Sequence, residues 1–345
     1  MLLFCFMLKT FFFLSTLAIA QAWPCQPETH GERMCTYMHE HARQYHSGGE
    51  FKLRKARVEA VRETIDDGVH FGLTSRSDRF EHELGRNMAL KLSMHRIFER
   101  DDAVAHVPLA RTHHKPIDWR SHNGKSYVTP VKDQGKCGGC FAFAAATVLE
   151  YWSAKHHGFP KSLSSQLLMD CTSGGRKPDA GCDGGLMEYV FEYGKRHPVA
   201  LDSDLPYHER LETCPDHSML SHVAVDSYGV LMHDDDPRAE SHIESLLHKY
   251  GPVSVGIDSA SMDNYRRGIF KASMCSNNID HAVTIVGYTD KAWIIKNSWG
   301  TGWGDRGYLY LERGKNACGV AEYIVYVKKA KRVLKRLSPQ WSYTI

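Results

Sequence analysis

Hydrophobic residues recur at helical spacing in the part of the chain that precedes residue 66. Two stretches there place apolar or aromatic side chains three, four or seven positions apart, which predicts two amphipathic helices. Their apolar faces are formed by Met34, Tyr37, Met38, His41 and Tyr45 in the first and by Phe51, Val58, Val61 and Ile65 in the second. Gly48 and Gly49 lie between the stretches and are expected to separate them.

The pattern further along the chain predicts one strong helix and then a series of strands. Phe141–Ala154 is rich in alanine, has no internal glycine or proline, and directly follows Gly138 and Gly139. After about residue 222 the apolar runs become short and rich in β-branched and aromatic residues, which is typical of strands. The predicted strands are Val253–Ile257, His281–Val286, Ala292–Ile295, Tyr308–Leu311 and Tyr323–Val327. Helices first and strands later predict an α+β fold in two lobes.

The first 22 residues have the pattern of a secretory signal. An apolar run follows Lys9, and the small residues of Ala18–Ala20 and Ala20–Ala22 are typical of signal-peptidase sites. A membrane anchor is the alternative, but the run after Lys9 is too short to cross a hydrocarbon core of roughly 30 Å. We therefore expect residues 1–22 to be removed and the chain to travel through the secretory pathway to the lysosome or the extracellular space.

Charge is nearly balanced along most of the chain. Lys and Arg number 43 and Asp and Glu number 40, for a net charge of +3, which does not indicate a nucleic-acid partner. The basic excess lies in residues 328–345, which contain six Lys or Arg residues and no acid. A solvated extension is the simpler interpretation of such a run. Binding of this tail to anionic surfaces is the alternative.

The cysteine count is odd once the signal is removed. The chain has ten cysteines, and Cys5 lies within the signal, so nine enter an oxidising compartment. One thiol must therefore stay unpaired or pair with another chain. An unpaired thiol in such a compartment is a candidate nucleophile.

Cys140 stands where a helix begins, and this position favours its thiolate. The helix N-terminus offers unpaired N–H groups and the positive end of the macrodipole, and a neighbouring imidazolium would lower the thiol pKa further. His281 begins a predicted strand, and Asn297 follows the next one. An amide orients an imidazole without taking its proton, and Trp299 is placed to cover that hydrogen bond. The side chain of Gln134 and the Cys140 N–H have the chemistry of oxyanion donors.

Each of these residues has a simpler interpretation when it is taken alone. Cys137 and Cys140 form a Cys-x-x-Cys pair, which occurs in redox dithiols and in zinc sites. A redox dithiol of the thioredoxin type requires a βαβ frame, which the pattern lacks. A zinc site requires a second close pair of ligands, and Cys171 and Cys182 are badly spaced for one. We therefore expect no metal and no cofactor.

Four stretches, in order, make a resemblance to a known family specific. They are residues 130–140 (Pro-Val-Lys-Asp-Gln-Gly-Lys-Cys-Gly-Gly-Cys), 181–187 (Gly-Cys-Asp-Gly-Gly-Leu-Met), 280–283 (Asp-His-Ala-Val) and 296–304 (Lys-Asn-Ser-Trp-Gly-Thr-Gly-Trp-Gly). The chain resembles papain-like cysteine peptidases of the cathepsin L type. It departs from the signature Cys-Gly-[Ser/Ala]-Cys-[Trp/Tyr] at Gly139 and Phe141. Phe141 keeps a planar ring but lacks the indole N–H donor.

The resemblance implies a two-lobed papain-like fold, with a helical left lobe and a β-barrel-like right lobe, preceded by a helical propeptide. It implies a signal at 1–22, an inhibitory propeptide at 23–114, a peptidase domain at 115–327 and a basic extension at 328–345. Catalysis would rest on Cys140, His281, Asn297 and Gln134. Substrate would be bound by Gly185, Leu186, Met187, Gly256, Ile279, Ala282, Trp299 and Tyr323, with apolar residues preferred at the second position before the cut.

The resemblance also implies how the cysteines pair. The expected disulfides are Cys137–Cys182, Cys171–Cys214 and Cys275–Cys318, which leave Cys140 free. Cys25 and Cys35 remain, and nothing in the family pattern says whether they bridge.

The expected partners are protein and peptide substrates, the chain's own propeptide and cystatin-like inhibitors. Relatives of the cathepsin B type carry a histidine-rich insertion at the place that follows Gly185, which restricts them to chain ends. None follows Gly185 in this chain, so the resemblance implies cleavage within chains. Two other functions stay open. A catalytically inactive binding protein would keep the same fold, and a transferase or ligase would pass the same thioester to an amine acceptor.

Histidines are concentrated in the expected propeptide. Ten of the 21 fall within residues 23–114, and an imidazole titrates near 6.5 when unperturbed. If His70, His82 and His95 are buried and neutral in the docked propeptide, acid would weaken docking. We therefore hypothesise that the zymogen opens in acid and is cut around Leu109–Lys115.

Overall fold

The structure is a computed structural model that describes residues 25–84, 114–172, 181–216, 222–233 and 239–333. The chain divides into two compact units, one ending at Glu59 and one beginning at Ala60. The expected signal lies outside the described residues. Within the described part, no helix is both long and apolar enough to cross a membrane.

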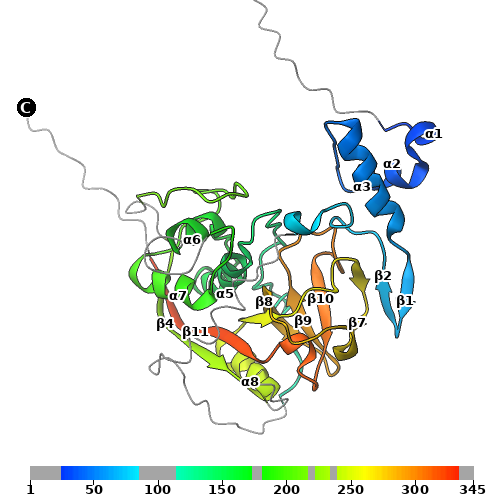
Figure 1. The fold of residues 1–345 in the computed structure, drawn as a ribbon. Coiled ribbons are helices and arrows are strands. Elements are labelled where there is room, and N and C mark those ends of the chain that lie inside the picture. Colours follow the sequence, from blue (N-terminus) through cyan, green and yellow to red (C-terminus); the bar gives the residue numbers. More distant parts are fainter. Residues whose placement is uncertain (1–24, 85–113, 173–180, 217–221, 234–238, 334–345) are drawn as a thin grey trace, which may run out of the picture. The chain divides into compact units, whose positions relative to one another are not determined.

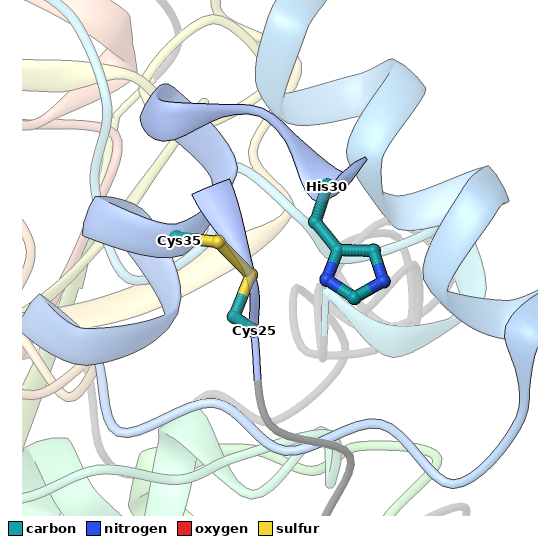
Figure 2. A group of neighbouring side chains, drawn as sticks. All are labelled: Cys25, His30 and Cys35. Carbon is teal, nitrogen blue, oxygen red and sulfur yellow. A yellow bond between two sulfur atoms is a disulfide. The ribbon is translucent and has the colours of Figure 1, made fainter. Parts of the chain in front are cut away.

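The first unit is helical and carries its own disulfide. Its helices are α1 (Pro27–His30), α2 (Glu32–Glu40) and α3 (Gly48–Ala60). Cys25 and Cys35 are bonded to each other, and His30 lies beside them, as Figure 2 shows. The three residues are close enough to hold a metal ion, but the disulfide occupies both sulfur atoms. In α3, Glu50 accepts a hydrogen bond from Arg54 one turn later at 3.2 Å.

The helix predicted through Ile65 ends earlier, at Ala60, so that part of the prediction was wrong. Ile65 lies on strand β1 (Thr64–Asp66) and is 67% exposed. β1 pairs antiparallel with β2 (Val69–Phe71) through the two-residue turn Asp67–Gly68, where both residues have positive φ. Asp-Gly is a strong signal for such a hairpin turn, and it outweighs the helical spacing. β2 then pairs with β6 (Tyr265–Arg267), which joins this hairpin to the C-terminal half of the chain.

The described residues of the second unit form four longer helices: α5 (Cys140–His157), α6 (Ser165–Thr172), α7 (Met187–Arg196) and α8 (Glu240–Tyr250). The predicted helix is confirmed as α5. Most of its length is buried on all sides, as expected for a helix that is apolar all round. It ends at Gly158, whose left-handed backbone lets its N–H bond to the Ala154 carbonyl at 2.8 Å.

Besides the sheet of β1, β2 and β6, the described strands form a second sheet in the order β4-β11-β5-β8-β9-β10-β7, with β3 paired to β8. Their bounds are β3 (Ile117–Asp118), β4 (Val223–Met232), β5 (Val253–Ile257), β7 (Ile269–Phe270), β8 (His281–Tyr288), β9 (Ala292–Lys296), β10 (Tyr308–Glu312) and β11 (Tyr323–Arg332). Short 3-10 turns lie at Glu81–Glu83, Ala272–Met274 and Ala317–Gly319. All five predicted strands are present.

Helices and strands gather in two lobes of this unit, which confirms the α+β prediction. In Figure 1, α5, α6 and α7 lie together, while β7 to β10 form the other group. β11 runs five residues past the predicted end at Val327 and pairs with β4 as far as Arg332. Lys329 and Lys331 on this extension both ion-pair with Asp226. Part of the basic extension is therefore strand, and residues 334–345 lie outside the described part.

A buried carboxylate ties the two lobes together. Glu150 on α5 is fully buried, and its carboxylate lies 2.9 Å from the ammonium of Lys132 and 3.6 Å from that of Lys296 at the end of β9. Thr129 donates its hydroxyl proton to Glu150 and accepts a hydrogen bond from Lys296 at 2.8 Å. The backbone N–H of Leu163 donates to the same carboxylate at 3.0 Å.

The charges in this cluster hold one another in the ionised state. Burial alone would raise the pKa of Glu150, but Lys132 and Lys296 hold that pKa below its ordinary value. Burial lowers the pKa of Lys296 to about 8, and Glu150 opposes that shift. Removing the carboxylate would leave two ammonium groups with no counter-ion in a buried site, which is costly.

We predict that Glu150→Gln lowers the free energy of unfolding by about 3–5 kcal/mol, the usual cost of breaking a buried ion pair. Because the folded pKa of Glu150 is depressed, its contribution is present above the unfolded pKa and is lost as pH falls through the folded one. In urea unfolding with the disulfides intact, the difference in free energy of unfolding between the wild type and Glu150→Gln should therefore become smaller in acid. Glu192→Gln removes a partly exposed carboxylate that pairs with Lys195 and Arg196, and should cost less than about 1 kcal/mol. Equal effects of the two variants would contradict the role of Glu150.

Candidate active site

Cys140 is the first residue of α5 and the only cysteine in the described part of the chain without a disulfide. It is fully buried. Backbone N–H groups of Ala282, Phe141 and Cys140 itself point toward its sulfur. The Ala282 contact brings this thiol, from the helical lobe, to the beginning of β8 in the other lobe.

The Cys137–Cys182 disulfide places a glycine loop beside the thiol. Cys182 also accepts a hydrogen bond from the Gly138 N–H at 2.8 Å, so this connection is double. Gly185 follows in the same loop, and a β-carbon at this position would stand 2.6 Å from the ring of Phe141. The phenyl ring therefore packs directly on the loop, and only glycine fits there.

His281 is oriented by a hydrogen bond of fixed direction. Its Nε2 lies 2.8 Å from Oδ1 of Asn297, and the same oxygen accepts the Ser298 N–H at 2.8 Å. Since that oxygen accepts from the backbone, the imidazole must donate to it through Nε2–H. Nδ1 is then the nitrogen that exchanges a proton with a reacting group. All three residues are buried.

Trp299 covers this hydrogen bond with its indole. The ring stacks on His281 with centroids 4.7 Å apart and an interplanar angle of 28°. Trp303 packs edge-on against the indole at 4.8 Å. Trp299 is 1% exposed, so water is kept from the imidazole–amide pair.

Gln134 is held by hydrogen bonds to both the oxygen and the nitrogen of its side-chain amide. Ser298 donates its hydroxyl proton to Oε1 at 2.6 Å, and Nε2 donates to the Cys137 carbonyl at 3.0 Å. The Gln134 N–H also donates to the Ser298 carbonyl at 2.8 Å. The amide is therefore fixed between the loop that precedes Cys140 and the loop that carries Asn297, which is the arrangement an oxyanion donor needs.

The residues expected to bind substrate come together around three adjacent strands. Gly256 on β5 pairs with Ala282 on β8, and Tyr323 begins β11, the neighbour of β5 on the other side. Ile279 lies just before β8, and Leu186 and Met187 lie at the start of α7. All six are buried.

The sequence analysis missed a partner of Tyr323. Its hydroxyl donates to the carboxylate of Glu188 on α7, and Glu188 is only 7% exposed. Glu188 directly follows Met187 in the chain, so its position beside the expected substrate residues could have been noticed. Its pairing with a tyrosine 135 residues away could not.

The remaining expected disulfides are present in the structure. Cys171 is bonded to Cys214 and Cys275 to Cys318. The first closes the helical lobe, and the second joins the loop after β7 to the turn before β11. With Cys25–Cys35 and Cys137–Cys182 they account for every cysteine of the described residues except Cys140.

The thiol is not activated in this state, which differs from the expectation for a helix N-terminus. Burial raises the pKa of Cys140 to about 12, and the charge of Asp280 acts in the same direction. The N–H groups of Ala282, Phe141 and Cys140 oppose the shift but are outweighed. Cys140, His281 and Asn297 are therefore in place while the Cys140 thiol is still protonated.

Comparison with known proteins places the chain in a family. Residues 114–328 match the model of the papain family cysteine proteases. A cathepsin L-like peptidase of Aedes aegypti is 38% identical over 221 residues, which cover 61% of this chain and 62% of that protein. Cathepsin L1 of Drosophila melanogaster is 32% identical over 344 residues, covering 91% of this chain and 89% of that protein. The match to the Aedes relative thus spans less than two thirds of that relative's length.

A solved structure extends the likeness to the region before the peptidase domain. Digestive procathepsin L 3 of the Tenebrio molitor larval midgut superimposes with a TM-score of 0.69 at 27% identity. The match covers 87% of this chain and 99% of the other. The chain therefore belongs to the papain family of cysteine proteases and has the papain-like fold, as the sequence motifs indicated.

We predict that Cys140 in the full-length chain reacts slowly with iodoacetamide at neutral pH. Because its pKa is raised to about 12, the thiolate fraction should grow about tenfold per pH unit through the mildly alkaline range. The intact mass of the protein measures the labelling, and Cys140→Ser identifies the labelled site. Rapid labelling of Cys140 at pH 7 in the uncleaved chain would contradict the raised pKa.

Proposed function

We propose that this chain is the zymogen of a cysteine endopeptidase that hydrolyses peptide bonds through a thioester. The observation that carries the proposal is the oriented pair of His281 and Asn297, with the Cys140 sulfur in contact with the N–H of Ala282, the residue after His281. Cys140 begins a helix and is the one cysteine of the described residues without a disulfide. That arrangement is the minimum needed for nucleophilic catalysis by a thiol.

The steps follow from the positions of these groups. Nδ1 of His281 accepts the Cys140 proton, and the sulfur attacks the carbonyl carbon of the scissile bond. The imidazolium then returns that proton to the leaving amine, the carbon–nitrogen bond breaks, and an acyl-thioester remains. A water molecule gives a proton to His281 and attacks the thioester, which releases the acid and restores the thiol. Asn297 holds the imidazole in the tautomer that these transfers require.

The oxyanion of each tetrahedral intermediate would be stabilised by the Gln134 side-chain amide and the Cys140 N–H. Gln134 is pre-positioned by Ser298, so little reorganisation is needed when charge develops. Gly185 would hydrogen-bond the extended substrate backbone, because it packs on Phe141, the residue after Cys140, and has no side chain of its own.

Latency would come from the chain's own N-terminal region. Residues 60–84 belong to the same compact unit as the peptidase domain, and β2 adds to its strand β6. We propose that residues 23–114 act as the propeptide, that cystatin-like proteins inhibit the processed enzyme, and that the site of action is the lysosome or the extracellular space. For the tail 328–345, a solvated extension stays the simpler interpretation and binding to anionic surfaces stays the alternative.

The histidine hypothesis for acid activation fits two of its residues poorly. His82 is exposed, and His70 on β2 is only half-buried, so neither meets the condition of burial. His95 lies outside the described residues. If the histidines are simply exposed, acid would act through carboxylates instead.

The direct test of the proposed activity is hydrolysis of internally quenched peptides by the processed protein. Cys140→Ser should abolish turnover. Gln134→Ala should lower kcat by about 10²–10³-fold with little change in KM, because it removes a donor that acts mainly in the transition state. Asp290→Asn, an exposed change at the far end of β8, should leave both constants unchanged. Turnover that survives Cys140→Ser, or product formation only with an added amine acceptor, would overturn the proposal.

We predict that Tyr323 limits the size of the residue accepted at the second position before the cut. The processed enzyme should prefer Leu or Val there over Phe and Arg. The buried phenol ring of Tyr323 is expected to occupy the base of the pocket and to shorten it. Tyr323→Ala should raise the Phe/Leu ratio of kcat/KM by about tenfold through the volume it frees. Tyr323→Phe keeps the ring and should leave that ratio within about twofold. An unchanged ratio in Tyr323→Ala would show that the pocket is formed elsewhere.

A further inference from the structure

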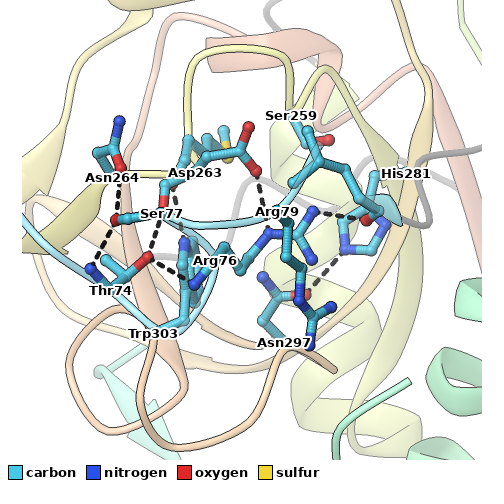
Figure 3. Close-up of polar contacts among 12 residues, drawn as sticks. Thr74, Arg76, Ser77, Arg79, Ser259, Asp263, Asn264, His281, Asn297 and Trp303 are labelled. Atoms are coloured by element: carbon cyan, nitrogen blue, oxygen red, sulfur yellow. Dashed lines mark hydrogen bonds and ion pairs between the residues drawn. The ribbon is translucent and has the colours of Figure 1, made fainter. Parts of the chain in front are cut away.

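A short segment that precedes the peptidase domain is fastened beside Trp299. Thr74 donates its hydroxyl proton to the Asp263 carbonyl at 2.7 Å, and Ser77 donates to Oδ1 of Asn264 at 2.9 Å. The Ser75 N–H bonds to the Gly302 carbonyl at 3.0 Å. Figure 3 shows Thr74 with Asp263 and Ser77 with Asn264, together with His281 and Asn297. The segment is thus held by its backbone and hydroxyls in one register.

This register places one cation directly on the indole. The guanidinium carbon of Arg76 lies 3.7 Å from the centre of a Trp299 ring, and its Nε donates to Oδ1 of Asp263 at 2.9 Å. Arg76 also donates to the Leu84 carbonyl within its own segment. Its side chain is 1% exposed. A planar cation between an aromatic face and a carboxylate is a well-formed recognition site for a guanidinium or an ammonium group.

A second arginine neutralises the other carboxylate next to the same tryptophan. Arg79 donates to the Gly135 carbonyl at 2.8 Å and lies 3.8 Å from the carboxylate of Asp133. The backbone of Asp133 is bridged to that of Trp299. Removal of this segment would therefore leave two carboxylates near Trp299 without their arginine partners. Arg266 carries a positive charge, opposite to that of the two carboxylates, and its guanidinium donates to the Leu73 carbonyl at 2.9 Å.

The position of the Trp299 indole indicates which part of a bound substrate would contact it. Trp299 stacks on His281, and His281 is the group that protonates the leaving amine. The loop with Gly185, which would bind the acyl part, is instead attached to the helical lobe by the Cys137–Cys182 disulfide. A substrate residue on Trp299 therefore belongs to the leaving-group part, C-terminal to the scissile bond.

We propose that Trp299 and Asp263 form a subsite that selects Arg or Lys in substrates on the C-terminal side of the cut, with Arg76 as its built-in occupant. Asp133 adds attraction to a second cation nearby. This inference rests on the proposed peptidase activity and adds a selectivity to it. The same contact gives Arg76 two roles, since it blocks the subsite in the zymogen and shows which side chain the subsite takes.

The experiment compares arginine with citrulline, which has the same shape but no charge. The processed protein is given quenched peptides that share Leu at the second position before the cut and carry Arg, citrulline or Ala at each of the first three positions after it. At one of these positions Arg should raise kcat/KM about tenfold over citrulline, and the gain should shrink as salt is added. Asp263→Asn should reduce the gain to within about twofold. Asp290→Asn makes the same charge change on an exposed turn at the far end of β8 and should preserve it.

Equal rates for Arg and citrulline at all three positions would overturn the subsite while leaving the peptidase activity established. A gain that persists in Asp263→Asn would also overturn it. If no peptide is cleaved, the proposed function fails and the subsite is judged by binding. A fluorescent peptide of residues 72–84 should then bind the processed protein about tenfold more tightly with Arg than with citrulline at position 76. Equal affinities would refute the inference.

Discussion

The carboxylate of Glu150 is the constraint on which the site depends. It lies on the helix that begins with Cys140, and it binds Lys296, the residue directly before Asn297. The thiol and the imidazole therefore belong to two lobes that this buried group of charges fastens to each other. An apolar contact would tolerate sliding of α5 against β9. A desolvated charge with two counter-ions and a backbone donor does not, because any shift leaves a buried charge unpaired.

Within this fixed frame the proposed catalytic groups are oriented by polar contacts to Ser298. Its backbone N–H fixes the direction of the Asn297 amide, and its hydroxyl fixes that of Gln134. One serine thus positions both the group that holds the imidazole and the proposed oxyanion donor. Trp299 follows it in the chain and covers the imidazole, so the burial that protects this hydrogen bond comes from the same loop.

Most of the site could be predicted from the sequence because its residues lie in short, contiguous motifs. Cys140 at a helix start and His281 at a strand start follow from local pattern alone. Five strands after residue 222 were also predicted, because they are continuous apolar runs bounded by turn residues. Strands β4, β6 and β7 in the same region were not predicted. The Asp67–Gly68 hairpin was a local signal too, but the helical spacing that ends at Ile65 concealed it. The hairpin pairs with strand β6, which lies almost 200 residues further along the chain. No periodicity in the sequence could show that pairing.

The features that the sequence could not show depend on contacts between distant segments. Tyr323 with Glu188, and Arg76 with Asp263, are pairs of ordinary residues until the fold places them together. The raised pKa of Cys140 is of the same kind, because desolvation is a property of the surroundings rather than of the helix start. Local chemistry therefore indicated Cys140 as the proposed nucleophile, while the packing around it sets the pKa of its thiol.

The most direct measurement of the central claim is the labelling of Cys140 by an epoxide probe before and after removal of the N-terminal region. The account predicts that the full-length chain labels slowly, and that the processed protein labels rapidly at Cys140, as mapped by mass spectrometry of its peptides. Cys140→Ser should abolish the label in both forms. A processed protein that remains unlabelled, while a reactive thiol peptidase labels under the same conditions, would contradict the claim that this chain is a latent cysteine endopeptidase.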